Sequence, residues 1–329
     1  MSSLQQFPAH STVTVRAPAR LHLGFIDITG SAGRQFGSVG ICINEIATKL
    51  SASLAGQHHA QGPGHARAMR CIERITSHFG TDSGIAVTIH QAIPEHIGLG
   101  SGTQMELAVA AACSRLLGYT LDADGLTSIL GRGARSGIGL ACFEQGGLIV
   151  DGGKGHHDGR PPVISRLCLP QDWRFLLILD HRGQGLHGKK EKDAFASLPP
   201  FLPSEAHRLA HLILMQALPA VAEGDIRLFG EAVTELQRTV GDYFAPAQGG
   251  CFTSPAVAEA LAWLKSKGAT GIGQSSWGPT GFCMAASPSQ AETWSDMLRE
   301  KYFGSGHLEI MTVTPRNRGA DIHHSACKD

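Results

Sequence analysis

The chain carries, at residues 93–104, the sequence Ile93-Pro-Glu-His-Ile-Gly98-Leu-Gly100-Ser101-Gly102-Thr103-Gln104. The alternating residues 85–89 before it predict a strand, and the apolar spacing across 104–117 after it predicts a helix with one buried stripe. Glycines at 98, 100 and 102 permit positive φ and a close approach of a ligand, and the N–H groups of a helix start favour anions. The loop is therefore either a phosphate site or an ordinary tight connection between a strand and a helix.

Two better-known glycine loops are excluded by the residues around this one. No lysine follows the glycines as in a Walker P-loop, and the dinucleotide spacing GxGxxG is absent. The hydroxyl groups of Ser101 and Thr103 are candidate donors to an anion and weak candidates for Mg²⁺ ligands. The candidate binding residues of this segment are Gly98, Gly100, Ser101, Gly102, Thr103 and Gln104.

Composition narrows the class of protein. The 28 Lys and Arg residues balance 28 Asp and Glu residues, so neither a nucleic acid nor an anionic membrane is expected as a partner. The 329 residues suggest two domains, and the 41 glycines, about 12%, exceed the usual ~7% without the low aliphatic content of disordered chains. No secretory signal, no apolar run of ~18 residues and no CxxC pair among eight cysteines is present, which predicts a cytoplasmic protein with reduced thiols.

The order of the predicted elements indicates an α+β fold, because strands come first and helices fall later. Strands are expected at 12–17, 21–28, 39–46, 85–89, 163–169, 174–180, 281–286 and 308–313. Helices are expected at 65–79, 104–117, 122–130, 204–221, 226–240, 254–267 and 288–301, with Arg67 on the solvent face of the first. Residues 137–150 predict a glycine-rich turn and a strand, and the last fifteen residues predict a frayed tail.

Three segments in a fixed order resemble the motifs of the GHMP kinase superfamily. They are Ala17-Pro-Ala-Arg-Leu-His-Leu-Gly24, Pro94 to Thr103, and Gly271-Ile-Gly-Gln-Ser-Ser-Trp-Gly-Pro-Thr-Gly281. The resemblance implies a two-domain fold with an active site in the cleft between the domains. Residues 1–170 would form the N-terminal domain, which resembles the second domain of ribosomal protein S5 and carries the phosphate loop. Residues 171–329 would form the α+β C-terminal domain.

One departure from the superfamily concerns its chemistry. Many of these kinases place a catalytic aspartate in a segment like Pro-Ser-Gly-Ile-Asp, whereas this chain has Arg135-Ser-Gly-Ile-Gly139. Glycine neither accepts a proton nor orients a hydroxyl, so the loss of phosphoryl transfer is expected. The loop also has Ser101-Gly-Thr-Gln104 where kinases usually have Ser-Ser-Ala.

Within the superfamily, the chain closely resembles the family of β-ribofuranosylaminobenzene 5′-phosphate synthases. The resemblance rests on RLHLGFID from Arg20, HIGLGSGTQ from His96, FEQGGLIVDGG from Phe143, GLHGKKEKDAF from Gly185 and GQSSWGPTGF from Gly273. It implies a transferase of tetrahydromethanopterin biosynthesis that condenses phosphoribosyl pyrophosphate with 4-aminobenzoate or 4-hydroxybenzoate and releases CO₂ and pyrophosphate. It also implies Mg²⁺, no organic cofactor and a homodimer.

The first motif supplies the candidate catalytic residues Arg20, His22 and Asp27. The guanidinium of Arg20 suits a bidentate contact with a phosphate or carboxylate, and a salt bridge at a strand edge is the alternative. Asp27 either binds Mg²⁺, orients His22 or makes a structural hydrogen bond.

Further candidates for substrate binding come from three other segments. Arg135 and Ser136 precede a glycine turn, and the alternative for Arg135 is a basic helix end. His187, Lys189 and Lys190 lie in a basic, glycine-flanked segment that predicts either a mobile lid loop or a solvated charge run. The third motif contributes Gln274, Ser275 and Ser276, and its Trp277 and the nearby Phe282 either stack on an aromatic acceptor or belong to the core.

Two other functions remain open at this level. The first is an ATP-dependent small-molecule kinase on the same fold, against which Gly139 argues. The second is a homologue that binds a ligand in the cleft without catalysis.

Overall fold

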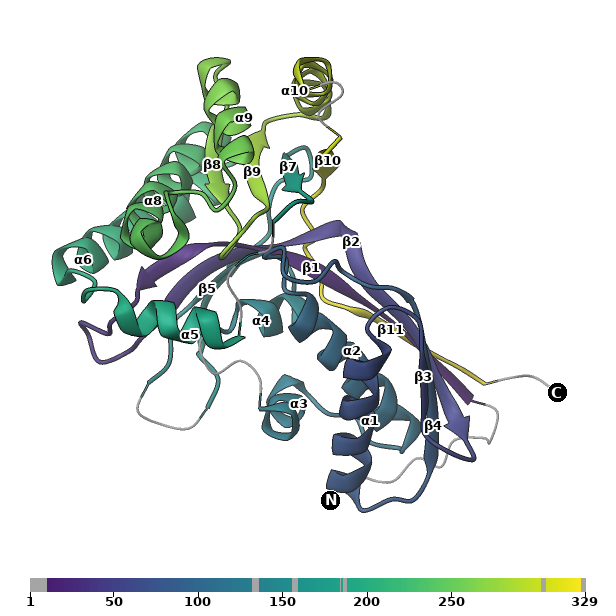
Figure 1. Cartoon of the computed structure of the whole chain (residues 1–329). Coiled ribbons are helices and arrows are strands. Elements are labelled where there is room, and N and C mark those ends of the chain that lie inside the picture. The colour runs from purple at the N-terminus through teal and green to yellow at the C-terminus, as the bar shows by residue number, and fades with distance from the viewer. Residues whose placement is uncertain are drawn as a thin grey trace.

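The computed structural model describes residues 11–131, 136–155, 159–183, 185, 188–302 and 306–326. Two sheets form the framework of the molecule, a long twisted one and a smaller one, and helices cover each of them (Figure 1). The mixture of helices and sheets is the predicted α+β class. Within the described residues, no helix is long and apolar enough to cross a membrane.

The larger sheet has seven strands, paired in the order β11-β1-β2-β4-β3, with β5 joined to β2 and β6 joined to β5. All pairs are antiparallel except β3 with β4. The strands are β1 (Ser11–Asp27), β2 (Gly37–Ala55), β3 (His59–Gln61), β4 (Gly84–Gln91), β5 (Leu148–Asp151), β6 (Val163–Leu167) and β11 (Asp321–Ala326).

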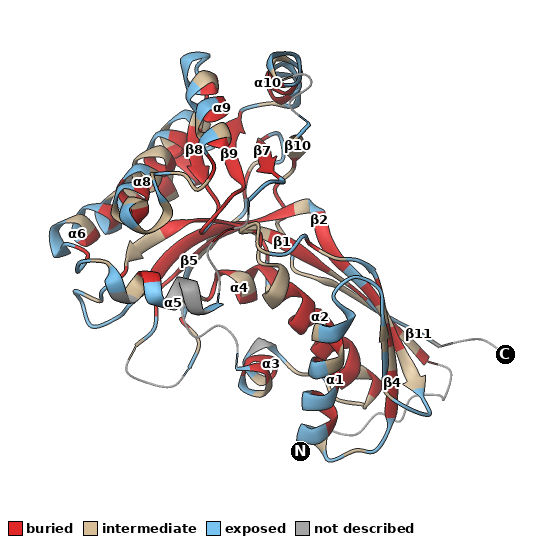
Figure 2. Ribbon diagram, in the orientation of Figure 1, coloured by how far each residue is buried: buried red, intermediate tan, exposed pale blue. Residues whose placement is uncertain are grey.

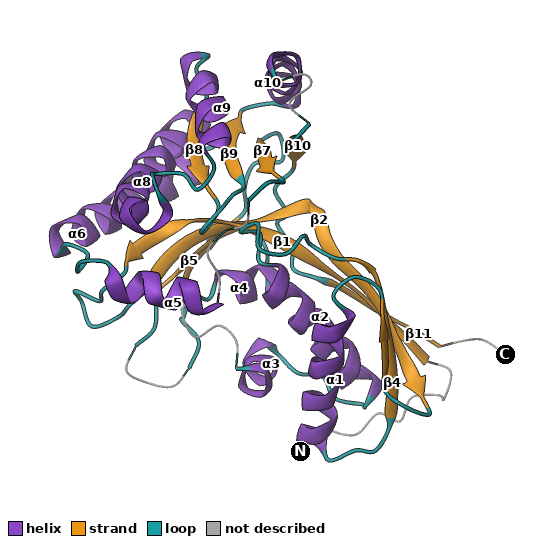
Figure 3. Ribbon diagram, in the orientation of Figure 1, coloured by secondary structure: helices purple, strands orange, loops and turns teal. Residues whose placement is uncertain are grey.

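Four helices cover one face of this sheet, as Figure 3 shows. They are α1 (His65–Phe79), α2 (Ser101–Leu116), α3 (Ala123–Leu130) and α4 (Ile138–Glu144). Ile72 of α1 and Val109 of α2 pack with Val13 and Val15 of β1 in one buried cluster. The predicted bounds of α1 are confirmed, and so is the cap of α3, where Asp122 accepts a hydrogen bond from the Gly125 N–H at 2.8 Å.

The smaller sheet is antiparallel, in the order β10-β7-β9-β8, and is buried on both faces (Figure 2). Phe175 and Leu177 of β7 face the core that contains α8, and Leu176 and Ile178 face α9 and α10. Burial on both sides explains why β7 is a continuous apolar run rather than an alternating one. The elements are β7 (Arg174–Asp180), β8 (Thr270–Gln274), β9 (Gly281–Ala285), β10 (Leu308–Val313), α8 (Ile226–Gln248), α9 (Pro255–Ser266) and α10 (Pro288–Lys301).

Strand β1 belongs to both cores. Val13, Val15 and Ala17 pack under α1 and α2, whereas Leu21 and Leu23 join the core that contains α8. The register with β2 shifts between Pro18 and Arg20, at the point where the strand passes from one core to the other. Arg20 and His22 are therefore held at the junction of the two halves of the molecule.

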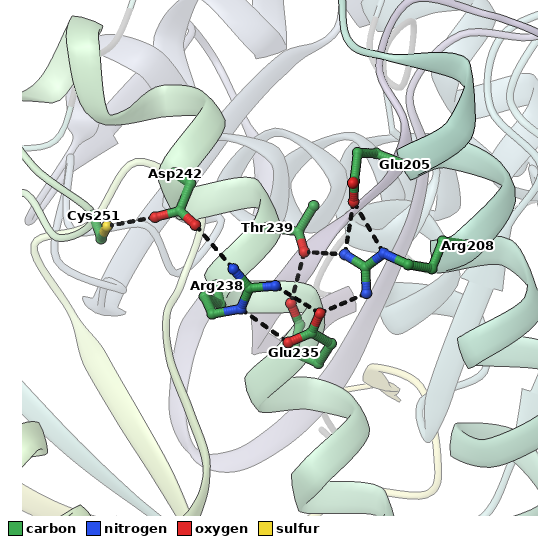
Figure 4. Close-up of polar contacts among 7 residues, drawn as sticks. All are labelled: Glu205, Arg208, Glu235, Arg238, Thr239, Asp242 and Cys251. Carbon is green, nitrogen blue, oxygen red and sulfur yellow. Dashed lines mark hydrogen bonds and ion pairs between the residues drawn. The ribbon is translucent and has the colours of Figure 1, made fainter.

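A chain of ion pairs fixes α6 (Pro203–Leu212) to α8 (Figure 4). Arg208 of α6 pairs with Glu205 at 2.7 Å and with Glu235 of α8 at 2.5 Å. Arg238 also pairs with Glu235, at 2.8 Å, and with Asp242, at 3.3 Å, and the Cys251 thiol donates to Asp242 at 3.1 Å. Between α6 and α8 lie the π-helical turn η1 (Ile213–Ala217) and α7 (Leu218–Glu223).

Three expectations from the sequence are wrong. Residues 137–150 contain the short helix α4 as well as a turn and a strand. Leu140 and Phe143 of this helix are buried, but the glycines around them obscured the helical spacing in the sequence. The basic segment expected to be a loop forms α5 (Gly188–Ser197), in keeping with its good helix formers. The supposed C-terminal tail forms β11, which pairs with β1 from Ser11↔Ala326 to Arg16↔Asp321.

Strand β11 also carries a charge partner for a buried arginine. Arg316 is 3% exposed, and its guanidinium pairs with Asp321 at 2.8 Å. Truncation after Ala320 removes this partner and the backbone bonds to β1, each worth about 0.5–1.5 kcal/mol. We expect the free energy of unfolding, measured by urea denaturation, to fall by at least ~3 kcal/mol. Truncation after Ala326 is the control, and equal midpoints for the two truncations would contradict this role of β11.

Candidate active site

The three motifs meet at the carbonyl oxygen of Gly98. This oxygen accepts hydrogen bonds from the Arg20 guanidinium and from the Ser275 hydroxyl, the latter at 2.7 Å. The same Ser275 oxygen accepts from the His22 N–H at 3.0 Å, and the His22 carbonyl accepts from the Ser276 N–H at 3.3 Å. Segments that are far apart in the sequence are thereby joined through one backbone atom.

Glycine is required at position 98. Its φ is +82°, and a Cβ there would lie 2.1 Å from the Ser275 carbonyl oxygen. Gly100 has φ +83° as the N-cap of α2, and a Cβ on it would lie 3.3 Å from Arg20 Cγ. The close contact of the loop with Arg20 and Ser275 thus depends on residues without side chains.

The first turn of α2 follows directly. Ser101, Gly102 and Thr103 are half-buried, so they keep some contact with solvent, whereas Gln104 is buried. The Gln104 side chain donates from Nε2 to the Gly139 carbonyl at 2.7 Å, and its Oε1 has no partner. The expected phosphate loop is therefore linked to the Arg135–Gly139 segment of the sequence analysis through Gln104.

Sequence reasoning placed Arg67 on the solvent face of its helix, and this is wrong. The side chain is 24% exposed, and its guanidinium forms ion pairs with Glu95 and Glu106, both at 3.2 Å. Gly102 lies so near that a Cβ on it would be 3.0 Å from Arg67 Nη1. The guanidinium beside the start of α2 is thus neutralised within the protein by two carboxylates. The sequence could not predict these contacts, because Gly102 is 35 residues away from Arg67 and the spacing of a helix does not reveal such distant neighbours.

Ser136 donates a hydrogen bond to the buried carboxylate of Asp151. Asp151 Oδ2 accepts hydrogen bonds from the hydroxyls of Ser38 at 2.7 Å and Ser136 at 3.2 Å, and from the Gly137 N–H at 2.9 Å. Burial raises the pKa of Asp151, and these hydrogen bonds oppose the rise. Asp151, which the sequence analysis did not single out, holds the turn that leads to Gly139; its one signal was a polar residue at the end of a buried strand.

The two other candidates of the first motif differ in environment. His22 is 4% exposed, and its Nε2 has no hydrogen-bond partner. Burial, and then the nearby charge of Arg20, lower the pKa of His22 to about 3, so the ring is neutral at ordinary pH. Asp27 accepts hydrogen bonds from Thr29, Gly30 and Ser31 with both oxygens, at 2.7–3.1 Å. Of the alternatives left open for Asp27, the structure favours the structural hydrogen bonds.

The candidate residues of the third motif are buried beneath the loop, and only Ser276 among them is exposed to solvent. Ser275 is fully buried, and Gln274, 5% exposed, accepts from the Thr253 N–H at 2.7 Å and donates to the Ser276 carbonyl at 3.2 Å. Ser276 is exposed and has φ +56°. Trp277 is 6% exposed, and Phe282 is fully buried in the core.

Four predicted residues receive no structural account. Arg135 and His187 lie outside the described residues, and so do the side chains of Lys189 and Lys190. In the part of the chain that is described, no three His, Cys, Asp or Glu side chains gather into a group that could hold a metal ion.

The neutral state of His22 has a consequence for stability. Between pH 6.5 and about 3, the unfolded chain binds a proton at this histidine and the folded chain does not, so stability falls as the pH falls. We expect His22→Phe to lose less stability than the wild type between pH 7 and pH 4.5, by about 2–3 kcal/mol in urea denaturation. His207→Gln, at an exposed position, is the control. Identical pH profiles for His22→Phe and the wild type would contradict the buried neutral ring.

Comparison with known proteins agrees with this arrangement. The model of the GHMP kinases N-terminal domain matches residues 66–147, and that of the GHMP kinases C-terminal domain matches residues 217–304. Solved structures share the fold at low identity. Mevalonate diphosphate decarboxylase from Staphylococcus aureus superposes with a TM-score of 0.65 at 14% identity, over 95% of this chain and 98% of that one. Homoserine kinase from Cytophaga hutchinsonii gives 0.61 at 16% identity, over 98% and 99%.

Curated relatives are much closer in sequence. A protein of Methanothermobacter thermautotrophicus named beta-ribofuranosylphenol 5′-phosphate synthase is 35% identical over 287 residues, 80% of this chain and 86% of the relative. A protein of the same name from Archaeoglobus fulgidus is 32% identical over 329 residues, 94% of this chain and 98% of the relative. Over such coverage these identities show the family, and the chain belongs to the beta-ribofuranosylphenol 5′-phosphate synthases, enzymes with the GHMP kinase fold.

Proposed function

We propose that this enzyme condenses phosphoribosyl pyrophosphate with 4-hydroxybenzoate or 4-aminobenzoate, with loss of CO₂ and pyrophosphate, to give a C-riboside 5′-phosphate. The relatives are named for a ribofuranosylphenol 5′-phosphate, which is the product that a 4-hydroxybenzoate acceptor would give. The resemblance to the family implies that this product is an intermediate of tetrahydromethanopterin biosynthesis. A cytoplasmic homodimer is part of the same proposal.

The observation that carries the proposal is the loop at Gly98–Thr103. Hydrogen bonds from Arg20 and Ser275 hold the Gly98 carbonyl in place, and the half-buried first turn of α2 follows the loop. The free N–H groups of a helix start and adjacent hydroxyls suit the pyrophosphate of the donor.

The reaction requires groups that stabilise the charge of the departing pyrophosphate more than it requires a nucleophile on the protein. The bond between ribose C1 and the pyrophosphate oxygen breaks, and the electron pair leaves with the pyrophosphate. The aromatic carbon that carries the carboxylate forms the new bond to C1, and CO₂ then departs, leaving its bonding electrons to restore the aromatic ring. The loop stabilises the departing pyrophosphate, and Arg20 holds the loop in the geometry that this requires.

Mg²⁺ is the expected metal, because it commonly binds through phosphates, water and only one or two protein oxygens. The residues present fit an ion held largely by the donor. The hydroxyls of Ser101 and Thr103 are half-buried, and the buried Oε1 of Gln104 is an acceptor without a partner. When bound, the ion would neutralise charge on the leaving pyrophosphate.

The glycine at position 139 argues against the alternative of an ATP-dependent kinase. A Cβ on this glycine would lie 3.2 Å from Thr103 Cγ2, so α4 and the loop are packed closely where a kinase would carry its aspartate. Glycine offers no group to orient or deprotonate an alcohol. A non-catalytic binding role remains the other outcome for the test below.

The proposal is tested by the release of labelled CO₂ from carboxyl-labelled 4-hydroxybenzoate and 4-aminobenzoate. We expect release that requires both phosphoribosyl pyrophosphate and Mg²⁺ and that matches pyrophosphate production one to one. Replacing both hydroxyls of the loop, in Ser101→Ala with Thr103→Ala, is expected to lower kcat/KM at least ~10-fold, the scale of lost donors to developing charge. Binding of the donor without CO₂ release would support the non-catalytic role, and ATP consumption with an alcohol would support a kinase.

A further inference from the structure

The chain between β7 and α5 passes close to the glycine loop at Gly185. The Gly185 N–H donates to the His96 carbonyl at 2.8 Å, two residues before Gly98. A Cβ on Gly185 would lie 2.6 Å from the Trp277 carbonyl oxygen and 2.3 Å from that of Gly278. Gly185 is therefore packed between the loop and the third motif, and a fourth segment of the sequence joins the candidate site.

Helix α5 begins three residues later, at Gly188. Three residues of extended chain span at most about 11 Å, so this contact keeps the start of α5 near the loop. Figure 1 shows α5 on the same side of the larger sheet as α4, the helix that contains Gly139. Lys189 and Lys190, which were predicted to bind substrate, belong to the first turn of α5, so their distance from the loop depends on where this helix is held.

Phe195, near the other end of α5, packs among four aromatic rings of the surrounding protein. Its ring centroid lies 5.5 Å from each of those of Phe36, Phe244 and Trp277, and 6.3 Å from that of Phe25. The interplanar angles of 76–88° give the edge-to-face geometry that aromatic pairs favour. The four rings come from β1, the turn before β2, α8 and the third motif, so one side chain connects α5 to both halves of the molecule.

Backbone strain at Phe36 is an independent sign that this contact matters. Phe36 has φ +65°, in the left-handed region that large side chains rarely adopt. Such strain persists where the surroundings enforce it, and it is concentrated at functional sites and ligand clamps. The same turn is also bonded to the chain that follows α5, because the Thr29 hydroxyl donates to the Phe201 carbonyl at 3.1 Å.

The described side chains of α5 provide few other apolar contacts. Ala194 is 9% exposed and Phe195 is half-buried, whereas Asp193 and Ser197 are exposed. A helix of ten residues is marginal in water without tertiary contacts, and elements with few buried apolar side chains open at low cost in free energy. The position of α5 is therefore expected to depend strongly on Phe195.

We propose that α5 is a cover for the donor site and that Phe195 is the positioning residue that docks it. This inference rests on the proposed function. With Phe195 packed among the four rings, α5 lies beside the loop and shields the bound pyrophosphate from water. When Phe195 leaves these rings, α5 moves away and the donor enters or the products leave. Docking of α5 and binding of the donor stabilise the same state, so each favours the other.

The first test measures the affinity for Mg²⁺-pyrophosphate by calorimetric titration. We expect Phe195→Ala to weaken binding at least ~10-fold, because only a fraction of the molecules would then hold α5 in the docked position. Phe195→Leu, which keeps most of the apolar volume, should bind within about 3-fold of the wild type. Thermal melts establish that each variant is folded. Wild-type affinity in a folded Phe195→Ala protein would overturn the role of Phe195.

Phe79 provides the matched control. It is also half-buried and packs on an aromatic ring, that of Tyr119 at 3.9 Å, but it lies at the end of α1 and not at the loop. Phe79→Ala should leave the affinity for Mg²⁺-pyrophosphate within about 2-fold of the wild type, since additivity holds for sites without shared contacts. Equal losses of affinity in Phe79→Ala and Phe195→Ala would show general destabilisation and overturn the specific role of Phe195.

Hydrogen exchange of the α5 amides distinguishes a cover from a merely structural helix. In the wild type, saturating Mg²⁺-pyrophosphate should slow the exchange of these amides at least ~10-fold, because the ligand favours the docked state. The amides of α9 (Pro255–Ser266) serve as the internal control and should change less than about 2-fold. Unchanged exchange of α5 in a wild-type protein that binds Mg²⁺-pyrophosphate would overturn the cover.

Binding and turnover separate this inference from the proposed function. Binding of Mg²⁺-pyrophosphate that depends on Phe195 supports the cover even if no CO₂ is released, and then only the reaction is wrong. In the CO₂ assay, Phe195→Ala should raise KM for phosphoribosyl pyrophosphate at least ~10-fold and lower kcat less than ~3-fold. CO₂ release by Phe195→Ala with wild-type KM and kcat supports the reaction and overturns the cover. A wild-type protein that does not bind Mg²⁺-pyrophosphate would overturn both.

Discussion

The carbonyl oxygen of Gly98 is the point on which the arrangement of the site depends. It accepts from Arg20 on β1 and from Ser275 beyond β8, so one backbone atom fixes the larger sheet, the loop and the smaller sheet relative to one another. The contact exists because position 98 carries no side chain and adopts φ +82°. Strand β1 makes the junction rigid, since its two ends are packed into different cores.

This junction separates two chemical environments on either side of β1. On one side, the start of α2 presents the half-buried Ser101 and Thr103, and on the other the neutral His22 ring lies against Phe25 among uncharged side chains. In the resemblance to the GHMP kinases, Gly139 stands where many members carry a catalytic aspartate, and a Cβ on it would lie 3.2 Å from Thr103 Cγ2. A reaction driven by a departing pyrophosphate and an electron-rich ring is compatible with the loss of that carboxylate.

Local signals predicted much of the framework, and long-range contacts decided the rest. The spacing of α1, the Asp122 cap and the doubly buried β7 are all visible in short windows of sequence. Strand β11 was missed because its largely polar sequence shows no apolar alternation and its partner strand β1 lies some three hundred residues away. Arg20 and Ser275 both donate to the Gly98 carbonyl, a contact that the sequence did not reveal, and their predicted contact with substrate stays a prediction. Asp151 and Arg67 were missed because their partners come from other elements, Ser38 and Gly137 for the one and Glu95, Glu106 and Gly102 for the other.

We propose that the junction at Gly98 shapes the anion site, and the affinity of Gly98→Ala for Mg²⁺-pyrophosphate measures how far binding depends on it. A methyl group at this position meets the Ser275 carbonyl, so the loop must move away from Arg20 and Ser275. Gly183→Ala, at a glycine whose added Cβ meets no atom within 4 Å, is the matched control. We expect calorimetry to find the affinity for Mg²⁺-pyrophosphate reduced at least ~30-fold in Gly98→Ala, or about 2 kcal/mol, and unchanged in Gly183→Ala. Wild-type affinity in a folded Gly98→Ala protein would contradict it.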